Sequence, residues 1–153
     1  MNNEEKATNF ETLTHINNVR DKVSEVISEL LGRAANHDKS KMADPELSSF
    51  VELTPKLASS TYGSEEYKKF LEQLKPALDH HYAKNSHHPE HHKDGINDMT
   101  IIDLIEMLCD WKAATMRHND GNIRKSIEIN AKRFNIDSQL TKMLENTVKE
   151  MGW

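Results

Sequence analysis

Residues 16–30 read INNVRDKVSEVISEL, and this stretch indicates the fold class. Its apolar side chains recur at steps of three and four residues, at Ile16, Val19, Val23, Val26, Ile27 and Leu30. That spacing gathers them on one face of an α-helix. We therefore expect an amphipathic helix here. Gly32 either ends it or joins it tightly to a second helix carrying residues 33–38.

The rest of the chain continues the helical pattern. Further helices are expected over residues 44–57, 64–78, 101–117, 122–134 and 137–151, several of them opened by capping residues such as Asp44, Ser64, Thr100 and Asp137. Residues 59–63, 84–99 and 118–121 have the composition of loops. The sequence thus predicts an all-α, single-domain bundle of six or seven helices over residues 1–153. Residues 1–12 would form a frayed lead-in, and residues 118–153 would form C-terminal helices.

Composition excludes several classes of function. The net charge of −5 is spread along the chain without a basic block, so binding to duplex nucleic acid is not expected. No apolar run approaches the roughly 20 residues of a membrane span, and the polar start does not resemble a secretory signal. The single cysteine, Cys109, cannot form an internal disulfide and suits a reducing, cytoplasmic setting.

Histidine is unusually frequent between residues 80 and 92. His81 extends the apolar stripe of Leu74 and Leu78, whereas His80 lies about 100° round the helix, so His81 is expected to point inward. Pro89 holds His88 extended, which favours presentation of His87 and His88 into a cavity. His91 and His92 are expected in solvent. The alternative is a polar, pH-sensitive loop.

Two earlier positions offer comparable side chains. His37 and Asp38 are adjacent, and an imidazole beside a carboxylate suits a divalent transition metal. On its own this dipeptide favours a surface helix end instead, with Asp38 capping the next turn. His15 lies beside the apolar stripe one turn before Val19 and is expected to point inward, either as a hydrogen-bonded core histidine or as a ligand.

The helix expected over residues 101–117 adds a carboxylate beside its apolar face. Asp110 has no evident structural role there, and an acid next to apolar surface is costly unless it is paired or metal-bound. The small side chains of Ala113 and Ala114 leave space beside it, and Arg117 follows two turns on. We expect Arg117 either to contact a phosphate or to act as an ordinary helix C-terminal cation.

Taken in order, these residues resemble the HD-domain superfamily of metal-dependent phosphohydrolases. Residues 37–41, HDKSK, are similar to the HDxGK motif of HD-GYP phosphodiesterases, with Ser40 in place of glycine. Residues 87–90, HHPE, followed by Asp94 and Gly95, are similar to the HHxE…DG motif, although no GYP follows. The likeness covers residues 14–117. The sequence also resembles a small family of phages and bacteria that shares His-Asp-x-Ser-Lys, His-His-Pro-Glu and Cys-Asp-Trp.

The resemblance implies a site and a reaction. His15, His37, Asp38 and Asp110 would hold a first metal, and His81, His87 and His88 a second metal or the phosphate. Asp38 would accept a proton, and Lys41 would stabilise charge on the phosphate. One or two ions of Mn, Fe, Co, Ni or Zn suit such ligands.

The expected activity is hydrolysis of a nucleotide-type phosphate ester, either a 5′-phosphomonoester or a dinucleotide phosphodiester. The alternatives are a non-catalytic metal- or nucleotide-binding module and an HD-type di-iron oxygenase. The expected partner is a small phosphorylated ligand, and a homodimer is left open.

Overall fold

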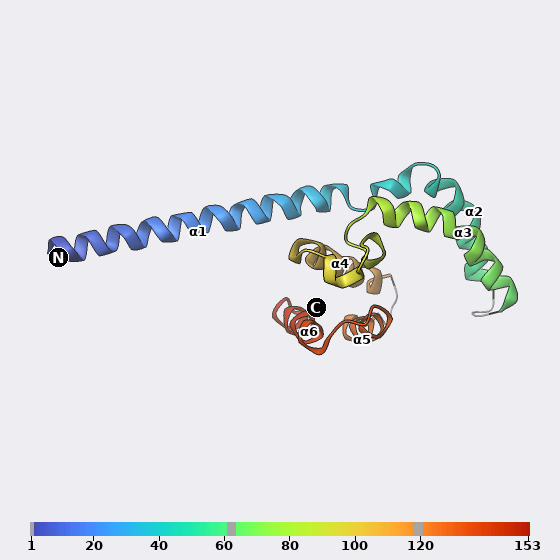
Figure 1. The fold of residues 1–153 in the computed structure, drawn as a ribbon. Helices are drawn as coiled ribbons and strands as arrows, with labels where there is room; N and C mark the ends of the chain where they lie inside the picture. Colours follow the sequence, from blue (N-terminus) through green and yellow to red (C-terminus); the bar gives the residue numbers. More distant parts are fainter. Residues whose placement is uncertain (1, 61–63, 118–120) are drawn as a thin grey trace. The chain divides into compact units, whose positions relative to one another are not determined.

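The computed structural model describes residues 2–60, 64–117 and 121–153 (Figure 1). Six α-helices lie in these ranges: α1 (Asn3–Asn36), α2 (Glu46–Ser59), α3 (Glu65–Lys84), α4 (Ile101–Thr115), α5 (Ile123–Arg133) and α6 (Ser138–Glu150). Three short 3₁₀ helices, η1 (Lys39–Met42), η2 (Pro89–His91) and η3 (Gly95–Asp98), occupy the connections. The described residues contain no strand, which confirms the all-α class. The predicted turns at residues 61–63 and 118–120 lie outside the described residues.

Contacts divide the chain into two units, residues 1–36 and residues 37–153, and each is described by itself. The prediction of one domain over residues 1–153 stays a prediction. None of the helices in the described residues combines the length and the apolarity that a bilayer crossing requires.

The first unit is the single helix α1. It begins at Asn3, so residues 3–12, part of the predicted frayed lead-in, are helical. The reason is a reciprocal cap: the Glu5 backbone N–H donates to Asn2 Oδ1 at 2.8 Å, and the Asn2 N–H donates to Glu5 Oε2 at 2.7 Å. Gly32 does not end the helix, since α1 continues through it to Asn36, whose side chain donates to the Gly32 carbonyl at 2.9 Å.

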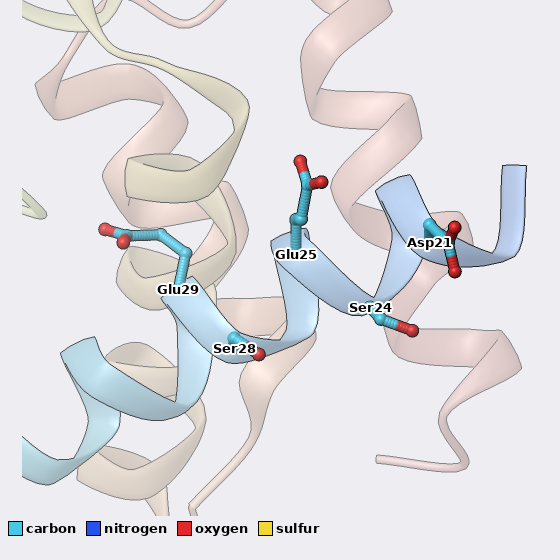
Figure 2. A pocket seen from close by; sticks show the side chains of 5 residues that line it. All are labelled: Asp21, Ser24, Glu25, Ser28 and Glu29. Carbon is cyan, nitrogen blue, oxygen red and sulfur yellow. The ribbon is translucent and has the colours of Figure 1, made fainter. Parts of the chain in front are cut away.

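Helix α1 is amphipathic, as the spacing predicts. One side carries acidic and hydroxyl side chains at steps of one turn, which Figure 2 shows for Asp21, Ser24, Glu25, Ser28 and Glu29. The apolar positions predicted to form the other stripe, Val19 and Val23 among them, are about half exposed, at 48% and 52%. The unit of residues 1–36 contains no second helix against which they could be buried.

The second unit has two hydrophobic cores. Leu53, Leu74 and Ala77 pack α2 against α3, and Leu108, Ile123, Ile127, Leu144 and Val148 pack α4, α5 and α6 together. Predicted side-chain caps begin α3 and α4: Ser64 accepts from the Tyr67 N–H, and Thr100 forms a capping box with Asp103. Helix α2 differs from the prediction, because it begins at Glu46 after Pro45 without a side-chain cap, although Asp44 Oδ1 accepts from the Ser48 N–H at 3.1 Å. The predicted loop between residues 84 and 99 connects the two cores and contains η2 and η3.

Candidate metal centre

The centre begins at His37 and Asp38, the first two residues of the second unit. Asp38 adopts a left-handed backbone conformation, with φ of 55°, which aspartate tolerates better than most residues. Its backbone carbonyl accepts from the Lys41 N–H at 2.9 Å, which closes the first turn of η1. The Lys41 ammonium returns to Asp38 Oδ2 at 2.6 Å. This short turn therefore fixes the carboxylate and places a lysine beside it.

Helix α3 supplies His81, the inward histidine of its pair as predicted. His81 is 1% exposed, and its Nδ1 donates to Glu46 Oε2 at 2.9 Å. His80 lies on the rim of the centre and donates from Nδ1 to the other Glu46 oxygen at 2.7 Å. Glu46 itself is fully buried at the start of α2. Because a carboxylate only accepts, Glu46 sets the tautomer of His81 and leaves Nε2 as the ring's lone-pair nitrogen.

The loop after α3 supplies His87 and His88. His87 is 2% exposed, and its ring centroid lies 4.1 Å from that of His88 and 4.4 Å from that of His37. His88 Nε2 lies 2.9 Å from His81 Nε2, so two imidazole nitrogens face one another. Pro89 is buried at the start of η2, in line with its predicted role of holding the preceding residue extended. His91 is exposed and donates from Nδ1 to the Tyr82 carbonyl.

Helix α4 supplies two carboxylates, Glu106 and Asp110, one turn apart. Glu106 Oε1 accepts from His37 Nδ1 at 2.9 Å and lies 3.3 Å from His87 Nδ1. Asp110 Oδ1 lies 3.6 Å from His37 Nε2. Glu106 thus turns Nδ1 of two rings toward itself and their Nε2 atoms away from it. This carboxylate–imidazole arrangement is the outer shell that orients histidine ligands in metal proteins.

The ligand atoms form two overlapping groups. Asp38, His81, His87 and His88 make the first group, and His37, His87 and Asp110 make the second. Within each group the candidate ligand atoms lie within 4.8 Å of one another. His87 belongs to both groups, so the two candidate metal positions are adjacent.

Unsatisfied polar atoms provide the test of whether a metal fits. Asp38 Oδ1 and His87 Nε2 are buried and have no hydrogen-bond partner. They lie 3.6 Å apart, and His81 Nε2 lies 3.3 Å from the same Asp38 oxygen. A buried acceptor without a partner costs roughly 1–3 kcal/mol, and a divalent ion bound by these atoms removes that cost. Imidazole nitrogens and a carboxylate oxygen are also the donors that divalent transition metals prefer, so the residues fit the group.

The pKa values of the centre favour the ligand forms of its side chains. Burial, with the neighbouring His87 and His81, lowers the pKa of His88 to about 3, so its ring is neutral near pH 7. Burial likewise lowers the pKa of His87. Burial alone raises the pKa of Asp38, but the neighbouring His81 ring and the hydrogen bond and charge of Lys41 outweigh it and hold that pKa well below the usual range. Asp38 is therefore suited to be an anionic ligand and is a weak proton acceptor.

The structure brings together six of the seven predicted ligands, and their role as ligands stays a prediction. The seventh, His15, lies in the unit of residues 1–36 and belongs to neither group, and its predicted role stays a prediction. Lys41 lies at the centre through Asp38. Arg117 is exposed at the end of α4 and does not line the cavity beside Asp110, which Ala114 does line.

Two carboxylates of the centre, Glu46 and Glu106, were not predicted as site residues. Glu46 follows Asp44 and Pro45, where an acid in the first helical turn is ordinary. Glu106 lies on α4 between Asp103 and Asp110, about one turn from each. Its spacing from Asp110 was the available signal, because residues four apart share one face of a helix. Asp103 is bonded to Thr100 and Ser86, whereas Glu106 faces the histidines.

Comparison with known proteins assigns the chain to a family. A family model described as "Family of unknown function (DUF5662)" matches residues 4–151. The chain belongs to this family. The match includes every residue of the DUF5662 chain that we place in the centre, together with His15. No curated protein and no solved structure matches the chain.

Proposed function

We propose that this DUF5662 chain is a metal-dependent phosphohydrolase that acts on a nucleotide-type phosphate ester. The observation that carries the proposal is the pair of buried, unpartnered atoms, Asp38 Oδ1 and His87 Nε2, inside a shell of imidazoles and carboxylates. The likeness of residues 37–41 and 87–90 to HD-domain motifs supports the same reaction.

Charge balance supports the binding of cations. The centre holds four carboxylates, those of Asp38, Glu46, Glu106 and Asp110, against one ammonium, that of Lys41. With neutral imidazole ligands this leaves an excess of negative charge in a half-buried site, and such a site repels a phosphate dianion. One or two bound divalent ions would offset this negative charge and attract the phosphate.

The proposed ligands are the members of the two groups, with His87 shared. A bound divalent ion lowers the pKa of a coordinated water from about 15.7 toward about 7 and polarises a phosphoryl oxygen. The chain's own contribution is orientation: Glu46 holds His81, and Glu106 holds His37 and His87. Lys41 supplies a cation at the rim for the phosphate oxygens, since its side chain is 39% exposed beside Asp38.

The experiment is a screen for phosphate release by the full chain after chelator treatment and reloading with Mn²⁺, Co²⁺, Ni²⁺ or Zn²⁺. Hydrolysis of a nucleotide that requires the added metal and is lost in Asp38→Ala supports the proposal. The matched control is Asp79→Ala, since Asp79 is exposed on α3 and paired with Lys75. Metal binding without turnover on any phosphate ester would contradict it and favour the non-catalytic alternative. An iron pair that consumes oxygen would favour the oxygenase.

Cellular setting and assembly belong to the same proposal. We expect action on a small soluble ligand in a reducing, cytoplasmic compartment, on the ground of the single cysteine. The centre is formed by residues of one chain, so a homodimer is compatible with it but is not needed to complete the described ligand groups.

A further inference from the structure

A cavity of about 240 Å³ adjoins the candidate metal centre within the second unit. It is lined by His88 of the first ligand group and by Asp110 of the second. The opposite wall comes from α5, through Ser126, Asn130 and Arg133, with Phe134 directly after the helix. A phosphoryl group at the centre would therefore have its leaving group directed into this cavity.

Three aromatic side chains line the cavity. Tyr82 comes from α3, Trp111 from α4 and Phe134 from the end of α5. The Trp111 and Phe134 rings are nearly parallel, with 7° between their planes and 6.4 Å between their centroids. The Arg133 guanidinium lies 4.7 Å from the centroid of Phe134. Aromatic and guanidinium faces suit a planar, apolar or heteroaromatic group.

The polar side chains on the α5 side offer both donors and acceptors. Arg133 Nη2 donates to Glu90 Oε1 at 2.7 Å, so this cation is already paired with a carboxylate. Asn130 donates to Ser126 Oγ at 3.3 Å and carries an amide that both donates and accepts. A second phosphate would meet the Glu90 and Asp110 carboxylates against one guanidinium, whereas an uncharged group with mixed hydrogen-bonding edges would not be repelled.

Size limits the ligand further. Pockets for drug-sized ligands are usually roughly 300–1,000 Å³, and this cavity lies below that range. It has room for one compact ring system and not for a second nucleotide.

We propose that this cavity binds the leaving group of the substrate, that the group is a single uncharged unit with an aromatic ring, such as one nucleoside, and that Asn130 and Arg133 select it. The inference rests on the proposed function and narrows it: the substrate is a phosphomonoester rather than a dinucleotide. It also gives α5, which lies outside the HD-like motifs, a role in specificity.

The first test compares steady-state kinetics of the metal-reloaded full chain. We expect a lower KM for nucleoside 5′-monophosphates than for glycerol phosphate, and little hydrolysis of dinucleotides. Arg133→Met and Asn130→Leu should raise KM for the nucleotides about tenfold, the loss of one hydrogen-bonding contact, and leave KM for glycerol phosphate unchanged. Lys132→Met is the matched control, because Lys132 is exposed on α5 and paired with Glu128. Unchanged nucleotide KM in both variants would overturn the inference.

The second test separates failure of the cavity proposal from failure of the enzyme proposal. Calorimetric titration of the metal-reloaded chain with adenosine 5′-monophosphate and uridine 5′-monophosphate reports binding whether or not hydrolysis occurs. Binding that quenches the fluorescence of Trp111 in a Trp153→Phe background, and that weakens about tenfold in Arg133→Met, supports the cavity even if no ester is hydrolysed. Absence of binding, or binding that neither variant weakens, contradicts it.

Discussion

His81 Nδ1 donates to Glu46 Oε2 at 2.9 Å, and both residues are buried. The contact joins α3 to the first turn of α2 across 35 positions of sequence. Ser40 Oγ also reaches the same Glu46 oxygen, at 3.1 Å, so the turn that carries Asp38 is tied to the same acid. One carboxylate therefore links three segments and orients the ring that faces Asp38.

Replacement of Glu46 by glutamine should weaken metal binding by about 10–100-fold, the usual effect of losing a partner that orients a ligand. The amide retains the shape of the side chain, but it lacks the charge and has only one oxygen to accept from His80, His81 and Ser40. Titration with Co²⁺, followed by absorbance, measures the effect. Glu52→Gln on the exposed face of α2 is the control and should bind like the wild type. Equal affinities for Glu46→Gln and Glu52→Gln would show that Glu46 does not orient His81.

Replacement of Glu106 by glutamine should act on both ligand groups. Its Oε1 faces Nδ1 of His37 and of His87. His37 belongs to the second ligand group, and His87 belongs to both groups. We expect a loss of affinity of about 10–100-fold for each ion bound. Calorimetry gives the affinities, with Glu128→Gln on α5 as the control. A variant that lost affinity for neither ion would contradict this role.

Asp103 should connect helix stability to the geometry of the centre. It closes the capping box of α4 with Thr100, and its Oδ1 accepts from Ser86 Oγ at 2.7 Å, next to His87. Asp103→Ala should destabilise the fold by about 1–2 kcal/mol in urea unfolding and weaken metal binding. Asp137→Ala, which removes the cap of α6, should cost about 1 kcal/mol and leave metal affinity intact. The same affinity in both variants would show that the Ser86 contact does not position the loop.

The metal-free chain should lose stability as pH falls below about 6.5. Burial, together with His87 and His81, lowers the pKa of His88 from 6.5 to about 3, so the unfolded state binds more protons between these values. The contribution of His88 is thus fully present above pH 6.5 and is lost as pH falls toward 3. Melting curves in chelator should show a falling Tm over this range and a shallower fall in His88→Gln. An equally steep fall of Tm with pH in the wild type and in His88→Gln would refute the lowered pKa of His88.

Periodicity predicts the parts of this molecule that depend on local sequence. The stripe that ends at Leu78 places His81 inward, and the Thr100–Asp103 spacing predicts the start of α4. The same reasoning did not predict the helix over residues 3–12, because it considered their polar composition and not the reciprocal cap between Asn2 and Glu5.

The rest of the centre depends on packing between distant helices. Glu46 and Glu106 look like ordinary helix acids until α2, α3 and α4 bring histidines to them. In the same way, Arg117 follows Asp110 in the sequence, just after α4 ends, but the cation that lines the neighbouring cavity is Arg133 of α5. A single sequence does not specify which turn of another helix faces a cavity.

His87 allows the most direct test of the account, because both ligand groups contain it. Chelator-treated wild-type chain, titrated with Co²⁺ or Mn²⁺ in a calorimeter, should bind one or two ions. His87→Ala should remain helical by circular dichroism and bind none with comparable affinity, whereas His91→Ala, in which an exposed histidine is removed, should bind like the wild type. Undiminished binding by His87→Ala would contradict the metal centre and the phosphohydrolase proposal built on it.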